Sequence, residues 1–394
     1  MSKIKIFNAH IITPGGILEG GALIIEDEKI QSIHSRNVTV ESMESINAEG
    51  KYLAPGFIDI HVHGGGGADF MDGTEEAFLT IAETHAQHGT TSMLPTTLSG
   101  SNEELANTIS AYERANNKNF KGAKFLGLHL EGPYFAMNQR GAQDPKYIRD
   151  PNPEEYQRIL ASTNAIKRWS AAPELKGAIE FGDYVKSKGI LIAAAHTDAV
   201  YEEVIHAFHH GYTLATHLYS GMSGVTRKNA FRYAGMIESA YLIDDMDVEI
   251  IADGVHLPTP LLQLVYKIKG SGRIALITDA MRAAGMPEGE SILGSKTIGL
   301  KVIVEDGVAK LPDRSSFAGS VATADRLVRT MVYQAGISLH ETIKMITQTP
   351  ARILGIDQKK GSIEIGKDAD LVIFDKDINV IMTMVEGKVI YLKG

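Results

Sequence analysis

Short apolar segments alternate with amphipathic helical segments through most of this chain, and this alternation constrains the fold more than any other feature. Helical periodicity is clear in stretches such as residues 74–89 and 201–211, each of which ends at a glycine. A strand-helix unit repeated eight times is typical of a closed parallel barrel rather than an open sheet. We therefore predict an α/β fold, a (β/α)8 TIM-like barrel. Its strands are expected at residues 56–63, 90–97, 123–132, 168–174, 190–197, 212–220, 248–256 and 273–281.

The two ends of the chain have a different texture, with short strands separated by turn signals. The N-terminal end has a turn at Pro14-Gly15-Gly16 and a hairpin through Asp27-Glu28, and the C-terminal end has a turn at Glu386-Gly387. Neither end is able to bury a core alone. We predict that residues 1–53 and 357–394 pair into one small β-sandwich domain, which flanks a barrel formed by residues 54–356.

Composition narrows the chemistry that the chain can perform. It contains no cysteine, so disulfides, thiolate metal sites and cysteine nucleophiles are excluded, and any metal must be held by His, Asp or Glu. The net charge of −9 argues against nucleic-acid and membrane-surface partners, which favour basic patches. The N-terminus lacks an apolar signal segment, and no apolar run has transmembrane length. We expect a cytoplasmic protein.

Polar side chains stand at the C-terminal ends of the predicted strands, where the rest of each strand is apolar. Strand alternation places His61 and His63 on one face, so both imidazoles can reach one metal ion. Taken singly, each such residue could equally be a buried structural histidine or an ion-paired glutamate. The joint pattern is stronger, because all these strand ends converge on one face of a barrel. Its members are His61, His63, Glu131, His196, His217, His256 and Asp279.

These residue types at one barrel face predict a metal-dependent hydrolase. Imidazole and carboxylate ligands suit Zn²⁺ or Fe²⁺. A bound divalent ion can lower the pKa of water from 15.7 to about 7, which provides a nucleophile at neutral pH. A neighbouring carboxylate can take the proton of that water and return it to a leaving nitrogen. Asp279 is the candidate for this role, and it could also be a metal ligand.

At this point the sequence resembles a known family. Its motifs follow, in order, those of the N-acetylglucosamine-6-phosphate deacetylases of the amidohydrolase superfamily, from about residue 50 to 376. LEGP together with TDA-x-x-AAG is specific to this family, whereas His-x-His is shared by most of the superfamily. The matching segments are GFIDIHVHG, LHLEGPY, AAHT, THLYSGM, ADGVH, TDAMRAAGMPEG, FAGSVATADRLVR, TPARILG and GSIEIGKDADLVIFD.

The resemblance implies removal of acetate from N-acetylglucosamine 6-phosphate, a phosphorylated amino-sugar, to give glucosamine 6-phosphate. It implies that Glu131, His196 and His217 hold one metal ion and that His61 and His63 hold a second, giving one or two ions per subunit. It further implies that Asp279 is the general base and acid and that His256 polarises the acetyl carbonyl of the substrate. Family members are typically homodimers in which a basic residue crosses over to the partner's phosphate.

The sequence departs from the family in the segment that grips the phosphate. An Asn-Ala pair is replaced by Ser220-Gly221, and a following Arg-Glu-Pro-Gly is absent. Ser220 and Gly221 could still offer a hydroxyl and backbone N–H groups. Positive charge could come from Arg227, Lys228 or Arg232, which could otherwise form a solvated basic loop. Gln143 stands where some members have histidine, and it could contact the sugar or the acetyl group.

Two alternatives stay open at this level. The chain could be an amidohydrolase with another N-acyl substrate, such as a dihydroorotase, an N-acyl amino-acid deacylase or a deacetylase of N-acetylgalactosamine 6-phosphate. Many such enzymes bridge two metals through a carboxylated lysine, whereas Glu131 takes the bridging position here. The chain could also be a barrel retained as a binding or scaffold protein. Such proteins usually lose ligands or the catalytic acid, and every expected polar group is present here.

Overall fold

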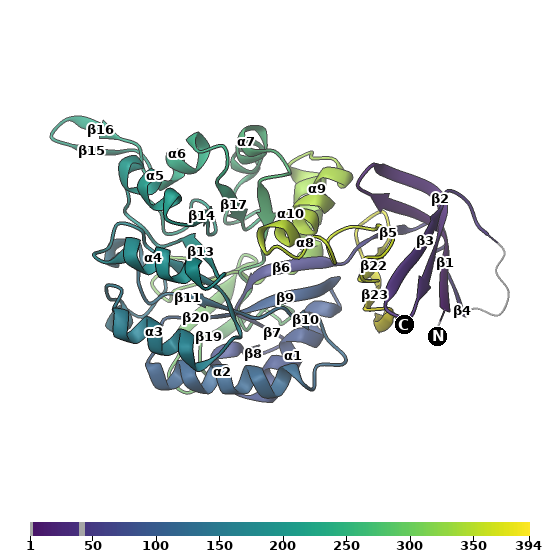
Figure 1. Cartoon of the computed structure of the whole chain (residues 1–394), viewed down its shortest axis with the longest axis horizontal. Helices are drawn as coiled ribbons and strands as arrows, with labels where there is room; N and C mark the ends of the chain where they lie inside the picture. The colour runs from purple at the N-terminus through teal and green to yellow at the C-terminus, as the bar shows by residue number, and fades with distance from the viewer. Residues whose placement is uncertain (1–2, 39–43) are drawn as a thin grey trace.

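Eight parallel strands form a barrel that makes up the body of the molecule (Figure 1). The computed structural model describes residues 3–38 and 44–394. The strands are buried on both faces, as expected for parallel strands covered by helices. The predicted barrel is confirmed. Around the barrel the strands are β6 (Phe57–Val62), β9 (Thr90–Thr97), β11 (Leu128–Glu131), β12 (Ile166–Ala171), β13 (Leu191–Ala194), β14 (Tyr212–Ala215), β17 (Asp247–Ile250) and β18 (Ile274–Leu276), with short β10 (Lys124–Phe125) also paired to β9.

The barrel closes between its first and last strands through residues beyond the end of β18. The backbone N–H of Asp279 donates to the carbonyl of His61 at 2.9 Å, and that of His63 donates to the carbonyl of Ala280 at 2.8 Å. Deeper in the barrel, the buried Asp59 carboxylate on β6 accepts the hydroxyl of Thr278 and its backbone N–H. Closure therefore brings Asp279 beside the two histidines of β6.

Each barrel strand leads into a helix, and the first three of these helices begin at a side-chain cap. Thr74 caps the first helix by accepting from the N–H of Ala77, and Ser101 forms a capping box with Glu104 at the second. The helices are α1 (Glu75–Ala86), α2 (Asn102–Asn116), α3 (Pro153–Ser162), α4 (Ala178–Ser187), α5 (Tyr201–His209), α6 (Met236–Leu242), α7 (Thr259–Lys269), α8 (Ala324–Arg329), α9 (Leu339–Ile346) and α10 (Gln348–Ile353).

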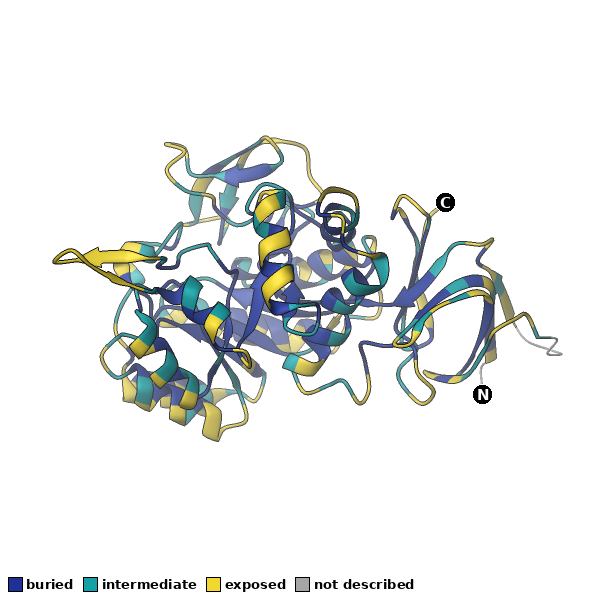
Figure 2. Cartoon of the chain, turned by 90° about the horizontal axis from the view of Figure 1, so that it is seen from above, coloured by how far each residue is buried: buried dark blue, intermediate teal, exposed yellow. Residues whose placement is uncertain are grey.

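Three small β structures lie in the loops after barrel strands. The hairpin of β15 (Thr226–Lys228) and β16 (Phe231–Tyr233) projects from the body of the molecule, and all its strand residues are exposed (Figures 1 and 2). A three-stranded sheet of β19 (Gly289–Leu293), β20 (Leu300–Glu305) and β21 (Val308–Lys310) follows β18. The pair β7 (Gly64–Gly65) and β8 (Ala68–Asp69) follows β6. These additions are irregular interruptions of the strand-helix alternation.

The two chain ends form one β-domain beside the barrel, as predicted (Figure 1). Antiparallel pairing of β5 with β22 joins the N-terminal strands to the C-terminal ones. Apolar side chains from both ends share one buried cluster, which includes Ile6, Leu53, Leu371 and Met382. The strands are β1 (Lys3–Thr13), β2 (Gly16–Glu26), β3 (Lys29–His34), β4 (Glu44–Asn47), β5 (Tyr52–Pro55), β22 (Leu371–Phe374), β23 (Val380–Val385) and β24 (Lys388–Leu392).

The predicted turns join neighbouring strands of this domain. Residues 14–15 connect β1 to β2, residues 27–28 connect β2 to β3, and Glu386-Gly387 connects β23 to β24. The domain boundaries at residues 53/54 and 356/357 stay a prediction. Within residues 3–38 and 44–394, no helix is both long enough and apolar enough to cross a membrane.

We predict that Thr278→Val destabilises the metal-free protein, because the buried Asp59 carboxylate loses its hydroxyl donor. The free energy of unfolding should fall by about 1–3 kcal/mol, the usual cost of a buried polar group left unpaired. Urea denaturation followed by circular dichroism measures this loss. Thr342→Val is the matched control, since the hydroxyl of the equally buried Thr342 has no hydrogen-bond partner in the part of the chain that the structure describes. An equal loss of unfolding free energy in both variants would contradict a stabilising role for the hydrogen bond between Asp59 and Thr278.

Candidate metal centre and active site

Six ionisable side chains meet at the C-terminal end of the barrel in two groups. His61, His63 and Asp279 form one group, and within it the potential ligand atoms lie within 4.8 Å of one another. Glu131, His196 and His217 form the other group on the same criterion, and all six residues are buried. The structure thus brings together the residues that the sequence analysis proposed as metal ligands.

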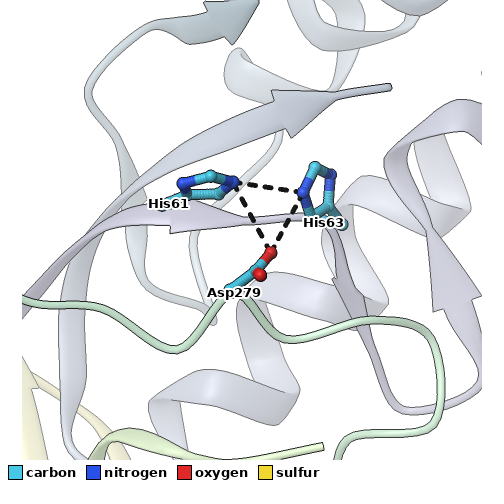
Figure 3. A group of neighbouring side chains, drawn as sticks. All are labelled: His61, His63 and Asp279. Carbon is cyan, nitrogen blue, oxygen red and sulfur yellow. Dashed lines mark hydrogen bonds and ion pairs between the residues drawn. The ribbon is translucent and has the colours of Figure 1, made fainter. Parts of the chain in front are cut away.

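The residues of the first group come from two segments that meet where the barrel closes (Figure 3). His61 and His63 belong to β6 and its C-terminal end, and Asp279 follows β18. The Nε2 atoms of His61 and His63 lie 3.2 Å apart. One oxygen of Asp279, Oδ1, lies 3.5 Å from the His61 nitrogen and 3.2 Å from that of His63. The three atoms therefore face a common point between β6 and the end of β18.

Glu131 lies between the two groups and contacts both. Its Oε1 atom is 3.1 Å from His217 Nε2, 3.5 Å from His196 Nε2 and 3.3 Å from His61 Nε2. Its Oε2 atom is 3.4 Å from His63 Nε2. A carboxylate with both oxygens directed at histidine nitrogens of two groups has the arrangement needed to bridge two cations.

Three of these residues adopt left-handed backbone conformations two or three residues beyond the ends of their strands. The φ angles are 48° for His196, 32° for His217 and 47° for Asp279. Such conformations are unfavourable for residues with a Cβ atom, and they concentrate at functional sites where the surrounding structure holds them. These unfavourable conformations direct the three side chains into the cluster, which suits a functional role for them.

The charges of the cluster favour occupation by a cation. Burial alone would lower the pKa of His61 and His63, but the carboxylates of Glu131 and Asp279 outweigh it and raise the pKa to about 9 and about 10. Burial would raise the pKa of Glu131 and Asp279, yet the surrounding histidines lower both, that of Glu131 well below its usual range. The carboxylates are therefore ionised, and protons on the histidines occupy the place that a divalent cation would take.

The second ring nitrogens of two ligands are held by backbone carbonyls. His196 Nδ1 lies 2.7 Å from the carbonyl oxygen of Gln139, and His63 Nδ1 lies 3.2 Å from that of Thr96. A carbonyl acceptor fixes the proton on Nδ1 and leaves Nε2 free as a metal ligand. The residues present fit a site for one or two divalent cations.

A cavity of about 280 Å³ opens beside these groups. It is lined by five of the six cluster residues, all except His61, and by loop residues from several strand ends. His256 also lines it, and Asp253 lies 2.8 Å from His256 Nδ1, which leaves Nε2 as the ring nitrogen available to a substrate. Ser220, Gly221 and Gln143 also line the cavity.

Gln143 lines the cavity and also contacts the carboxylate of Glu131. Its amide nitrogen donates to Glu131 Oε2 at 2.7 Å, and its amide oxygen accepts the backbone N–H of Ser99 at 2.9 Å. In this structure it holds the Glu131 carboxylate in place.

Arg227 and Lys228 are not brought to this cavity within one chain. Both lie on the projecting β15–β16 hairpin and are exposed, as is Arg232. Among the described residues, no lysine or arginine lines the cavity. An anionic substrate group in this cavity could be hydrogen-bonded by the neutral groups of Ser220 and Gly221, and positive charge would have to come from residues outside the cavity lining.

Several residues that support the site were not expected from the sequence. Arg168 and Glu249 form a buried ion pair inside the barrel, and Phe317 packs against His256 with ring centroids 4.7 Å apart. No sequence signal set this pair apart, because each strand carries a second charged residue, Lys167 on β12 and Asp247 on β17. Phe317 begins FAGSVATADRLVR, one of the segments that match the family, but no local pattern gave it a role.

Sequence comparison with known proteins also points to a metal-dependent amidohydrolase. The amidohydrolase family model matches residues 52–390. The N-acetylglucosamine-6-phosphate deacetylase of Haemophilus influenzae is 33% identical over 388 residues, which cover 98% of this chain and 99% of that protein. The N-acetylgalactosamine-6-phosphate deacetylase of Escherichia coli O157:H7 is 32% identical over 380 residues, covering 96% and 97% of the two chains.

A solved structure gives the same result. The crystal structure of N-acetylglucosamine-6-phosphate deacetylase from Pasteurella multocida superimposes with a TM-score of 0.92 at 30% identity, and the match covers 99% of this chain and 100% of that one. The resemblance found in the motifs is thereby confirmed over nearly the whole chain. This chain belongs to the N-acetylglucosamine-6-phosphate deacetylase family of the amidohydrolases.

Proposed function

We propose that the chain hydrolyses the N-acetyl group of N-acetylglucosamine 6-phosphate and releases acetate and glucosamine 6-phosphate. The observation that carries this function is the buried cluster of four histidines and two carboxylates, Glu131 and Asp279, at the cavity. Its position at the C-terminal strand ends is where barrel enzymes place their active sites. The identity of the substrate is inferred from the names of the relatives.

The cluster would hold two divalent cations, Zn²⁺ or Fe²⁺. Glu131, His196 and His217 would hold one, and His61 and His63 would hold the second, with Glu131 in contact with both groups. When bound, the metal supplies a Lewis acid that brings the pKa of water near neutrality. A cytoplasmic location stays a prediction.

Asp279 would move the proton during hydrolysis. Its carboxylate is ionised, because the neighbouring histidines lower its pKa against the effect of burial, so it can accept a proton from the attacking water. The water oxygen bonds to the acetyl carbon, the C–N bond breaks, and Asp279 returns the proton to the leaving nitrogen. His256 would contact the acetyl carbonyl oxygen through Nε2.

The phosphate would be bound by Ser220 and Gly221 together with cations from a second subunit. The cavity has no lysine or arginine of its own among the residues described. The exposed Arg227 and Lys228 lie on β15, in the β15–β16 hairpin that projects from the body (Figure 1). A homodimer in which this hairpin reaches the partner's cavity would supply the missing charge.

N-acetylgalactosamine 6-phosphate is the second candidate substrate. A relative named for that activity is 32% identical to this chain, close to the value for the relatives named for the gluco epimer. The acetamide and phosphate of the two sugars are the same, so the cluster serves either one.

Asp279→Asn should retain the metal and lose turnover. The amide cannot accept the proton of the attacking water, and we expect kcat to fall by about 10²- to 10⁴-fold. Acetate release from N-acetylglucosamine 6-phosphate, measured alongside metal content, tests this. A near-wild-type kcat in the metal-loaded variant would contradict the role given to Asp279.

Replacing Arg227 and Lys228 together by serine should weaken the binding of phosphorylated substrates. KM should rise at least tenfold for N-acetylglucosamine 6-phosphate and change little for unphosphorylated N-acetylglucosamine, because only the former needs the cations. Steady-state kinetics with both sugars provide the comparison. Lys188→Ser, an exposed lysine on the barrel, is the control. Similar increases for both sugars would remove the phosphate assignment.

Metal binding should release protons at neutral pH. Because the pKa of His61 is raised to about 9 and that of His63 to about 10 in the metal-free protein, both rings carry protons at pH 7.5 that a cation must displace. Affinity should therefore increase with pH up to about pH 9–10. Calorimetry in buffers of different ionisation enthalpy should show release of about one to two protons. A His61→Gln/His63→Gln variant that releases as many protons as the wild type would contradict this account.

A further inference from the structure

A buried ion pair lies in the barrel interior among the strands that carry the metal cluster. The side chains of Arg168 on β12 and Glu249 on β17 have no exposed area. Arg168 Nη1 contacts Glu249 Oε1, and Arg168 Nη2 donates to Glu249 Oε2 at 2.9 Å. Neither residue lines the cavity, so neither can touch the substrate there.

The arginine reaches the residues directly before two of the cluster histidines. Its Nη1 atom donates to the carbonyl oxygen of Ile60 at 3.0 Å, and its Nη2 atom donates to Thr216 Oγ1 at 2.9 Å. Ile60 precedes His61, and Thr216 precedes His217. One guanidinium thus ties together the strand ends that carry one ligand from each group.

The glutamate reaches the same two histidines. Glu249 Oε2 lies 3.6 Å from His61 Nδ1 and accepts the backbone N–H of His217 at 3.4 Å. The second of these contacts supports a residue whose backbone is in the unfavourable left-handed region. The ion pair therefore lies beneath both metal-binding groups.

His61 Nδ1 is the polar atom that gives this arrangement a function. It is buried and has no hydrogen-bond partner among residues 3–38 and 44–394. Metal binding through Nε2 requires the ring proton to be on Nδ1, where it needs an acceptor. Glu249 Oε2, at 3.6 Å, is the carboxylate oxygen that faces it, and a small ring movement would complete the hydrogen bond.

We propose that Glu249, held in place by Arg168, is a positioning residue for the metal centre. It fixes the tautomer and ring orientation of His61 and so sets the affinity of the His61–His63–Asp279 group for a divalent cation. The inference rests on the metal centre of the proposed function, and it adds two residues that control the cation from outside the ligand set.

Metal titration tests this role without relying on catalysis. Glu249→Gln keeps the side-chain shape but has a single oxygen, which cannot serve both Arg168 and His61 as the carboxylate does. Arg168→Met/Glu249→Leu replaces the whole pair by apolar side chains, a change that buried ion pairs often tolerate. Glu155→Gln is the matched control, because Glu155 also pairs with an arginine, Arg149, and contacts none of the cluster residues.

Zn²⁺ is titrated into metal-stripped protein by calorimetry, and the metal-free proteins are compared by thermal unfolding. We expect two ions in the wild type and in Glu155→Gln. In Glu249→Gln and in the double variant, affinity for one ion should fall about 10- to 100-fold while the other ion is retained. The double variant should unfold near the wild-type temperature, which separates positioning from a purely structural role.

Three results would overturn the inference. Wild-type affinity for both ions in Glu249→Gln and in a folded double variant would do so and would leave the proposed function intact. Equal weakening of both ions, with a large loss of thermal stability, would show a structural pair only. A wild-type chain that binds no Zn²⁺ would refute the metal centre itself and this inference with it.

Discussion

Four histidines and two carboxylates are buried together at one end of the barrel, and the arrangement around them depends on keeping their charges compensated. Ionised carboxylates in an interior site are unfavourable unless they are paired or bound to a cation. Here protons on His61 and His63 serve that purpose in the metal-free protein, and Glu131 contacts every histidine of the cluster. A divalent cation in place of these protons would also compensate the carboxylate charges, and it would add the ability to activate a water molecule.

The geometry of the cluster is set by the barrel and by its polar interior. The ligands lie at the ends of the barrel strands, and three of them have left-handed backbone conformations that turn their side chains toward the cluster. The hydrogen bond between Asp59 and Thr278 closes the barrel and brings Asp279 beside His61 and His63. Arg168 and Glu249 then occupy the interior below. A preorganised centre of this kind needs little rearrangement when a cation or a substrate arrives.

Much of this could be predicted from the sequence because the relevant signals are local. Apolar segments that end in His, Glu or Asp define both the barrel and its reactive face, and turn residues such as Glu386-Gly387 mark the hairpins of the β-domain. The Arg168–Glu249 pair depends on register across the barrel, which no local pattern encodes. The direction of the β15–β16 hairpin and the position of Phe317 depend on loop packing in the same way.

The most direct test of the central claim is acetate release by the metal-loaded protein from three sugars. These are N-acetylglucosamine 6-phosphate, its galacto epimer and unphosphorylated N-acetylglucosamine. The account predicts rapid release from the gluco phosphate and at least tenfold lower kcat/KM for the unphosphorylated sugar, because the phosphate contacts are lost. No acetate from any of the three, with both metal groups filled, would contradict it.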